Sequence, residues 1–462
     1  MIRSLVVFTY SFPLCDTVKV INRINLLVRK VKVGSLTFYG VITEIIYLLF
    51  FLVEPLKGLL GDNFREVTSD RIFVILFVVF LTLTFIYIKV TRVIDFQKVK
   101  FKHIVLFSLL FNLTLLPIRP VMSSDLYTYI SRSRVYSEYH ANPYTVPYNS
   151  FSEDVLYQQL VTRWSTYTAI YGPLFIFFGS LITLIAQNNL FLNIYIFKLF
   201  FVIMNIANIF LIKKITNDKK AVLLYSWNPL ITLEFALNAH NDVLMISFFL
   251  VGVLFLFSKK RNIFTYTSSW LFFFTSVLVK LFTVIFIPFI FIHIIRKLPN
   301  KSKFIFLIIA FFGSVVLLIM PFIPFWDGWR IFSRLFEVVQ MEGYVTTVGI
   351  LTLFFFLAML RVPNPSVLSK VISKSFFYIS YTIIVVKSVF DRNIVQENRL
   401  LWYLAISASL FYIFFISRFF PWYFTTLITI YVIYVGITKN NSLIALIHGM
   451  TLYALSTYII LR

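Results

Sequence analysis

Residues 225–257 read YSWNPLITLEFALNAHNDVLMISFFLVGVLFLF, two apolar runs that are joined by the polar turn 238–242. Apolar runs of this kind cross a bilayer as helices, because a helix satisfies its own backbone hydrogen bonds in hydrocarbon. Glu234 lies within the first run, although an ionisable side chain at membrane depth costs about 3 kcal/mol on insertion scales. The stretch therefore predicts two membrane helices with a functional polar turn.

The rest of the chain has the same character. Of its 462 residues, 60% are hydrophobic and 13% are charged, whereas soluble domains are about half apolar and about a quarter charged. We therefore expect an all-α, polytopic membrane protein with about twelve to fifteen membrane-embedded helices. Candidate helices lie near 37–54, 72–90, 103–118, 170–187, 190–212, 220–237, 242–257, 263–279, 281–295, 303–324, 346–361, 372–388, 398–416, 420–437 and 442–460.

The net charge of +23 reflects short basic clusters between apolar runs, a pattern typical of membrane topology and not of nucleic-acid binding. By the positive-inside rule, the basic segments are predicted to be cytoplasmic. They are 91–102, 213–220, 258–261 and 296–303. The interval 119–168 contains no lysine and should be extracytoplasmic. An odd number of crossings must then separate it from 213–220, yet two apolar segments lie between them. We therefore expect 190–212 to span while 171–186 dips in or lies near the surface.

The expected organisation is one membrane-embedded unit in three parts. Residues 1–118 form an interfacial segment and the first three membrane helices, 119–168 form an extracytoplasmic loop with an amphipathic helix, and 169–462 form the remaining transmembrane helices. Residues 1–35 lack the pattern of a signal peptide. The lone Cys15 excludes an internal disulfide, and the chain has no GxxxxGK[ST] loop and no HExxH spacing.

The polar stretch 123–144 follows an apolar run. As a helix it places Asp125, Tyr129, Arg132 and Tyr136 on one face, and it must end by Asn142-Pro143. A carboxylate can take a proton from a sugar hydroxyl, a guanidinium can hold a phosphate, and a tyrosine ring can pack on a carbohydrate. The alternative is a capped surface helix with an interfacial belt of tyrosines.

Two further polar groups interrupt apolar sequence. The first comprises Glu234, Asn238, His240, Asn241 and Asp242, although Asn241 or Asp242 alone could cap the following helix. The second is Lys280, which lies where two short helices would join on the extracytoplasmic side, or which snorkels to ordinary headgroups. Residues 326–330, WDGWR, should also be outside. Arg418 is either a ligand contact or part of an aromatic belt.

These segments occur in a fixed order along about residues 120–425. The set is SDLYTYISRSRVYSEYHANPY (124–144), YGPL (171–174), WNPL (227–230), Glu234 with NAHND (238–242), VKL (279–281) and PWY (421–423). As an ordered set it resembles the multi-spanning GT-C glycosyltransferases. It is most similar to the mannosyltransferases that use polyprenyl-phosphate mannose, including the bacterial α-1,6-mannosyltransferase group.

The resemblance implies a catalytic base in an early extracytoplasmic loop, which matches Asp125. Ser124 replaces the first acid of the pair found in some members, so a divalent metal is left open and no other cofactor is implied. The expected substrates are a polyprenyl-phosphate sugar and a glycan or glycolipid acceptor at the bilayer surface. Candidates for holding the leaving phosphate are Arg132, Arg134, His240, Lys280 and Arg418. The remaining expected substrate contacts are Tyr129, Tyr136, Tyr171, Glu234, Asn238, Asn241 and Asp242.

The main alternative is a transporter or flippase of lipid-linked saccharides. Such a protein should carry polar groups across the full membrane thickness, whereas the polar residues of this chain are predicted to concentrate on one side. A structural protein of envelope assembly with a degenerate site, or a ligase that moves a whole glycan or a pentose, are further alternatives.

Overall fold

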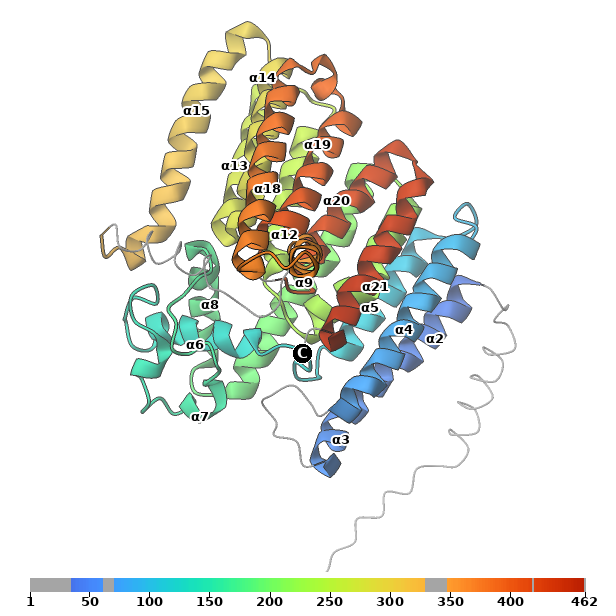
Figure 1. Cartoon of the computed structure of the whole chain (residues 1–462), viewed down its shortest axis with the longest axis vertical. Coiled ribbons are helices and arrows are strands. Elements are labelled where there is room, and N and C mark those ends of the chain that lie inside the picture. Colours follow the sequence, from blue (N-terminus) through green and yellow to red (C-terminus); the bar gives the residue numbers. More distant parts are fainter. Residues whose placement is uncertain (1–34, 61–69, 329–346, 418, 461–462) are drawn as a thin grey trace, which may run out of the picture.

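The computed structural model describes residues 35–60, 70–328, 347–417 and 419–460. Within these ranges the regular elements are all helices and there is no β-strand, which confirms the predicted all-α class (Figure 1). Cys15, the predicted interfacial segment up to residue 34 and Arg418 lie outside the described residues. Of the predicted outer segment WDGWR, only residues 326–328 are described.

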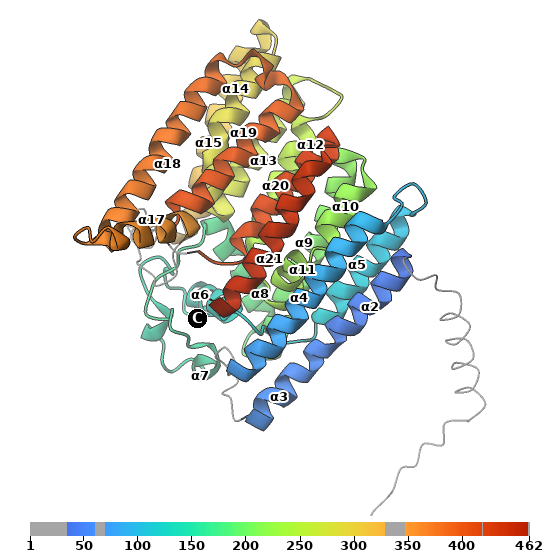
Figure 2. The ribbon, with the colours of Figure 1, turned by 45° about the vertical axis from the view of Figure 1, so that its right-hand side comes forward.

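The first helices form a layer of neighbours along one side of the molecule (Figure 2). α2 packs against both α4 and α5. The elements of this layer are α2 (Leu36–Leu48), η1 (Leu49–Leu52), α3 (Val53–Leu60), α4 (Asp70–Val93) and α5 (Phe101–Leu115). α2 with η1, α4 and α5 match the predicted runs 37–54, 72–90 and 103–118, whereas α3 lies mostly beyond the first of them.

The polar interval after α5 folds into short elements that pack on α8 and α9. α6 ends at Ser137, before Asn142-Pro143, as predicted. The elements are α6 (Asp125–Ser137), η2 (Tyr148–Ser150), α7 (Tyr157–Leu160), α8 (Pro173–Ala186) and α9 (Leu190–Thr216). α8 has 14 residues and rises only about 21 Å, whereas α9 has 27 and rises about 40 Å. Only α9 is long enough to cross about 30 Å of hydrocarbon.

The predicted continuous helix 220–237 is wrong, because the chain breaks at Trp227. Pro229 has no N–H for a helical hydrogen bond, and the Asn228 side chain accepts from the N–H groups of Leu230 and Ile231 to start a new helix. The pieces are α10 (Lys219–Ser226), α11 (Pro229–Thr232) and the π-helical turn η3 (Leu233–Leu237). The segment Pro229–Leu237 then meets α12 (Asp242–Leu256) at an angle of 118°.

The rest of the chain forms further helices, several of which are broken into shorter pieces. They are α13 (Ile263–Val279), η4 (Leu281–Phe286), α14 (Ile287–Lys297), α15 (Asn300–Ile319), η5 (Met320–Phe325), α17 (Val348–Met359), α18 (Pro365–Phe390), η6 (Arg392–Val395), α19 (Glu397–Leu410), η7 (Phe411–Phe415), α20 (Tyr423–Thr438), η8 (Asn441–Leu443) and α21 (Ile444–Ile460). In the described chain six helices are long and apolar enough to cross a membrane, or seven if the bent pair is one span. Five more helices are apolar but shorter.

Contacts between connecting segments define two ends of the bundle. At one end the Lys219 ammonium donates to the backbone oxygens of Phe96 and Val99, and Lys439 pairs with Asp218 at 2.7 Å. We call this the lysine-rich end; it carries residues 94–100, 217–220, 258–262, 297–300, 391–397 and 439–441. The other end carries residues 116–172, and we call it the loop end (Figures 1 and 2).

Buried charged side chains gather at the loop end. In the described parts of the chain they are Arg132, Arg134, Asp154, Lys198, Glu234 and Asp242. Lys198 belongs here because its ammonium donates to the backbone oxygens of Leu115 and Ile118, just after α5. The predicted concentration of polar groups on one side therefore holds for charged residues.

For neutral polar residues the same prediction is wrong. A buried chain of hydrogen bonds joins Asn112, Asn205, Tyr225 and Asn208, so it continues from α5 into α9 and α10 toward the lysine-rich end. Asn228 likewise donates to Thr451 at 2.8 Å. Hydrogen bonds between these buried groups offset most of the cost of removing them from water, although Asn208 Oδ1 has no partner in the described structure. These hydrogen bonds link α5, α9 and α10 to one another, and Asn228 to α21.

Candidate active site

Asp125 is the first residue of α6. Its backbone N–H donates to Ser123 Oγ at 3.2 Å, and the N-cap residue Ser124 makes no side-chain cap hydrogen bond. The Asp125 carboxylate lies with Oδ2 3.6 Å from His240 Nδ1, and its side chain is 17% exposed. Ser123 therefore contributes to the start of the helix, while the Asp125 carboxylate remains partly open to a ligand.

The surroundings of Asp125 make its carboxyl group a better proton acceptor than an ordinary aspartate. Burial raises its pKa to about 6, while the positive charges of Lys280 and Arg132 act in the opposite direction. A general base works best when its pKa lies near the working pH. The carboxylate is thus mostly ionised at neutral pH and more basic than a surface aspartate.

Glu234 lies beneath Asp125 on the π-helical turn η3 and is fully buried. Its Oε1 accepts from the Tyr458 hydroxyl at 2.7 Å and its Oε2 from Asn238 Nδ2 at 3.1 Å. Asn238 Oδ1 in turn accepts from the backbone N–H of Met122 at 3.2 Å. π-turns occur often at functional sites. Here the turn connects α21 with the segment that leads into α6.

His240 sits between the two carboxylates. Its Nε2 is 3.2 Å from Glu234 Oε2, and its ring stacks on Trp422 with centroids 3.9 Å apart. The backbone N–H donates to the Glu234 carbonyl oxygen at 2.9 Å, and the preceding Ala239 has φ +61°. The turn 238–242 therefore aims the imidazole at Asp125 and fixes its plane against the indole.

Tyr129 and Arg132 extend the site along α6, as the helical spacing predicts. The Tyr129 hydroxyl donates to Asn241 Oδ1 at 3.3 Å, and the Arg132 guanidinium lies 5.3 Å from the centroid of the Tyr171 ring. Arg132 is only 4% exposed, and its Nη1 has no hydrogen-bond partner in the described structure. A buried guanidinium nitrogen without a partner is costly and suits an anionic ligand.

Lys280 forms an ion pair with Asp242, the first residue of α12. Its Nζ donates to both carboxylate oxygens at 2.8 Å and lies 4.8 Å from the centroid of the Tyr423 ring. The extended backbone of Lys280 separates α13 from η4, so the predicted junction of two short helices is confirmed. Asp242 is 1% exposed and starts α12, where a carboxylate is favoured by the helix dipole.

Gly172 holds the Tyr171 segment against this junction. Its N–H donates to the Val279 carbonyl oxygen at 3.2 Å. A Cβ atom at Gly172 would lie 1.7 Å from the Leu278 carbonyl oxygen, so only glycine fits. The YGPL motif thus brings Tyr171 next to Lys280 by a close approach of two backbones.

Two predicted residues are placed apart from the cluster. Arg134 donates to both oxygens of Asp154 at 2.8 and 2.9 Å, and to Gln187 O and Asn188 Oδ1 at 2.9 Å. All its nitrogens are engaged, so it fastens the loop to the turn between α8 and α9. Tyr136 lies further along α6, with its ring 4.8 Å from that of Phe325.

The described residues contain no group of three or more His, Cys, Asp or Glu side chains that is placed to hold a metal ion. Arg418 cannot be placed, because it lies outside the described ranges.

Three residues of the cluster were missed by sequence reasoning as site residues. Trp422 and Tyr423 belong to the PWY motif, whose aromatic and proline residues were a usable signal. Tyr458 lies in an apolar C-terminal helix and offers no local signal. Only the tertiary fold brings its hydroxyl to Glu234.

The fold and the cluster define a multi-pass, all-helical membrane protein with a candidate active site built around Asp125 at one end. Residues 53–296, more than half of the chain, match the family model described as alpha-(1->6)-mannopyranosyltransferase, N-terminal domain. The chain belongs to this family and is a membrane mannosyltransferase of the GT-C type. No curated protein matches it. The matched region includes Asp125, Glu234 and Lys280 but not Trp422, Tyr423 or Tyr458.

Proposed function

We propose that this mannosyltransferase moves mannose from a polyprenyl-phosphate donor to a hydroxyl of a glycan or glycolipid acceptor, with Asp125 as the catalytic base. The observation that carries the proposal is the contrast among the carboxylates of the cluster. Glu234 and Asp242 are fully buried and each is held by hydrogen bonds, whereas the side chain of Asp125 is 17% exposed. Asp125 is thus the carboxylate that an acceptor hydroxyl can reach.

The chemistry proposed is one inverting displacement. Asp125 removes the proton of the acceptor hydroxyl as its oxygen bonds to the anomeric carbon, and the bond between that carbon and the phosphate oxygen breaks. The leaving group is a polyprenyl phosphate that carries away the bonding electrons. Arg132, with its unpartnered Nη1, and the Lys280 ammonium supply positive charge for that phosphate. The donor's own phosphoester bond supplies the driving force.

The buried neighbours act as positioning residues. Glu234 holds Asn238 and Tyr458, and its other neighbour His240 is clamped against Trp422. This network fixes the imidazole beside Asp125, so the carboxylate does not need to reorganise when the acceptor arrives. Support for an extracytoplasmic site comes from charge: the cluster lies at the loop end, opposite the lysine-rich end that the positive-inside rule places in the cytoplasm.

The test is sugar transfer by the purified full-length protein. Short-chain polyprenyl-phosphate donors that carry different sugars are offered with a mannoside acceptor, and product is followed by mass spectrometry. Asp125→Asn should lower kcat by roughly 10²- to 10⁴-fold. Glu138→Gln, an exposed carboxylate just after the same helix, is the matched control and should keep full turnover.

Unchanged turnover of Asp125→Asn would overturn the base assignment. Transfer from a nucleotide sugar, with none from any polyprenyl-phosphate donor, would overturn the donor class. Glu234→Gln separates the positioning role, because it should lower kcat while leaving the pH dependence set by Asp125 in place.

A further inference from the structure

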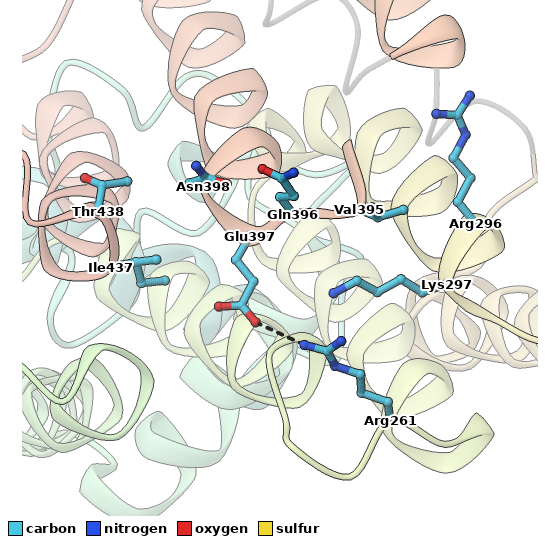
Figure 3. A pocket seen from close by; sticks show the side chains of 9 residues that line it. All are labelled: Arg261, Arg296, Lys297, Val395, Gln396, Glu397, Asn398, Ile437 and Thr438. Atoms are coloured by element: carbon cyan, nitrogen blue, oxygen red, sulfur yellow. Dashed lines mark ion pairs between the residues drawn. The ribbon is translucent and has the colours of Figure 1, made fainter. Parts of the chain in front are cut away.

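A basic cavity of about 810 Å³ opens at the lysine-rich end, remote from the mannosyltransferase cluster. It is formed by the ends of helices that are distant in sequence: the segment before α13, the end of α14, the start of α19 and the end of α20. The charged and amide side chains that line it are Arg261, Arg296, Lys297, Gln396, Glu397 and Asn398 (Figure 3).

The positive charge of this cavity is only partly compensated. Arg261 Nη2 lies 3.9 Å from Glu397 Oε1, at the limit of an ion pair, and Arg261 is 60% exposed. Lys297 is half-buried and has no carboxylate partner in the described part of the chain. Figure 3 shows the Lys297 ammonium and the Arg261 guanidinium directed into the same space. The cavity thus holds these two cations and one carboxylate, Glu397, which lies within ion-pair distance of Arg261.

Arg296 is held out of this space by backbone groups. Its guanidinium donates to the carbonyl oxygens of Val389 and Asp391, at the end of α18, and Figure 3 shows it pointing away from Lys297. It therefore braces the wall of the cavity and adds a nearby positive charge. The cavity is a fixed feature, because its cations come from elements that are tied together.

The start of α19 also favours an anion. α19 begins in the cavity at Glu397, and Gln396 provides no side-chain cap, so the positive end of the helix dipole faces the same space. Apolar Val395 and Ile437 complete the wall.

We propose that this cavity binds a phosphate group at the membrane surface, carried by the headgroup of an anionic lipid. Basic pockets between membrane helices on the positively charged side are suited to such headgroups. The apolar wall and the position at the helix ends favour a lipid over a free phosphate. The site is separate from the proposed transferase reaction and does not depend on it.

The test uses the full-length protein purified in a nonionic detergent. Binding of dihexanoyl phosphatidylglycerol is measured by calorimetry, with zwitterionic dihexanoyl phosphatidylcholine and sodium phosphate as further probes. The variant Arg261→Gln/Lys297→Gln should weaken phosphatidylglycerol binding by about 30-fold (about 2 kcal/mol), on the effect of each cation at an anionic surface. The matched control Lys259→Gln/Lys301→Gln removes two exposed charges from the same end and should change binding less than about twofold.

Equal weakening in both double variants would overturn the site and leave only general attraction to a basic surface. Equal binding of the two phospholipids, or no binding of either phospholipid or of phosphate, would also overturn it. Competition by sodium phosphate supports the phosphate chemistry and assigns free phosphate as an occupant. Lys297→Arg should retain binding, and melting temperatures near that of the wild type show that each variant is folded.

Discussion

Replacing Asp125 by asparagine should make the protein more stable while it removes activity. The Asp125 carboxylate is held in a site that disfavours its ionised form, so its pKa rises from 3.8 to about 6 on folding. In the unfolded chain the same group ionises freely. Asparagine has nearly the same shape and no charge to bury, and it therefore avoids this cost.

The magnitude follows from the difference between the two pKa values. The shift from 3.8 to about 6 corresponds to about 3 kcal/mol, at 1.36 kcal/mol for each pKa unit. The sign is set by proton binding: between the two values the folded state binds more protons than the unfolded state, so raising the pH destabilises the wild type. The cost is absent below the unfolded pKa and complete above the folded one. About half of it is present at pH 5 and nearly all at pH 7.5, a growth of about 1.4 kcal/mol.

The assay is thermal unfolding of both proteins in detergent at pH 5, 6, 7 and 7.5. The asparagine variant should melt higher, and the gap should widen by roughly a few degrees as the pH rises. Glu138→Gln is the control and should show no such widening. A variant that melts lower than the wild type above pH 7, or a gap that does not depend on pH, would falsify the view of Asp125 as a destabilised carboxylate.

Three further predictions concern the surroundings of Asp125. Lys280→Met should cost about 3 kcal/mol, because it leaves the buried Asp242 unpaired; adding Asp242→Asn should restore the melting temperature but not turnover, and no coupling in this double-mutant cycle would contradict the ion pair. Gly172→Ala should lower the yield of folded protein sharply, as seen by size-exclusion chromatography, since its Cβ has no room; a normal profile would disprove the close approach. Arg134→Met should lower the melting temperature by stranding the carboxylate of Asp154, while kcat of the folded fraction stays within about threefold; a selective loss of kcat would instead place Arg134 in the site.

Much of the architecture could be predicted because apolar length alone specifies membrane helices. The break at Asn228-Pro229 was also readable, since proline removes a helical donor, yet the apolar run concealed it. The π-turn at Glu234 could not be foreseen. It depends on how Asn238 and Tyr458 meet that carboxylate, and these contacts form only in the folded protein.

The candidate site shows the same division between local and long-range information. Helical spacing put Asp125, Tyr129 and Arg132 on one face, and Tyr129 and Arg132 both contact Tyr171. Arg134 is two residues beyond Arg132 and so falls on another side of α6. Arg134 was a candidate phosphate ligand because of its charge, but its position on the helix places it away from the face that carries Asp125, Tyr129 and Arg132.

The hydrogen bond from Tyr458 to Glu234, together with the stacking of Trp422 on His240, has a consequence for protein engineering. The region that matches the family model contains Asp125, Glu234 and His240. The side chains that contact Glu234 and His240 include Tyr458 and Trp422, which lie beyond residue 296. A chimera that joined this region to an unrelated C-terminal half would inherit the proposed base without the residues that support its surroundings. Functional exchange between relatives should therefore require that both halves be transplanted as a matched set.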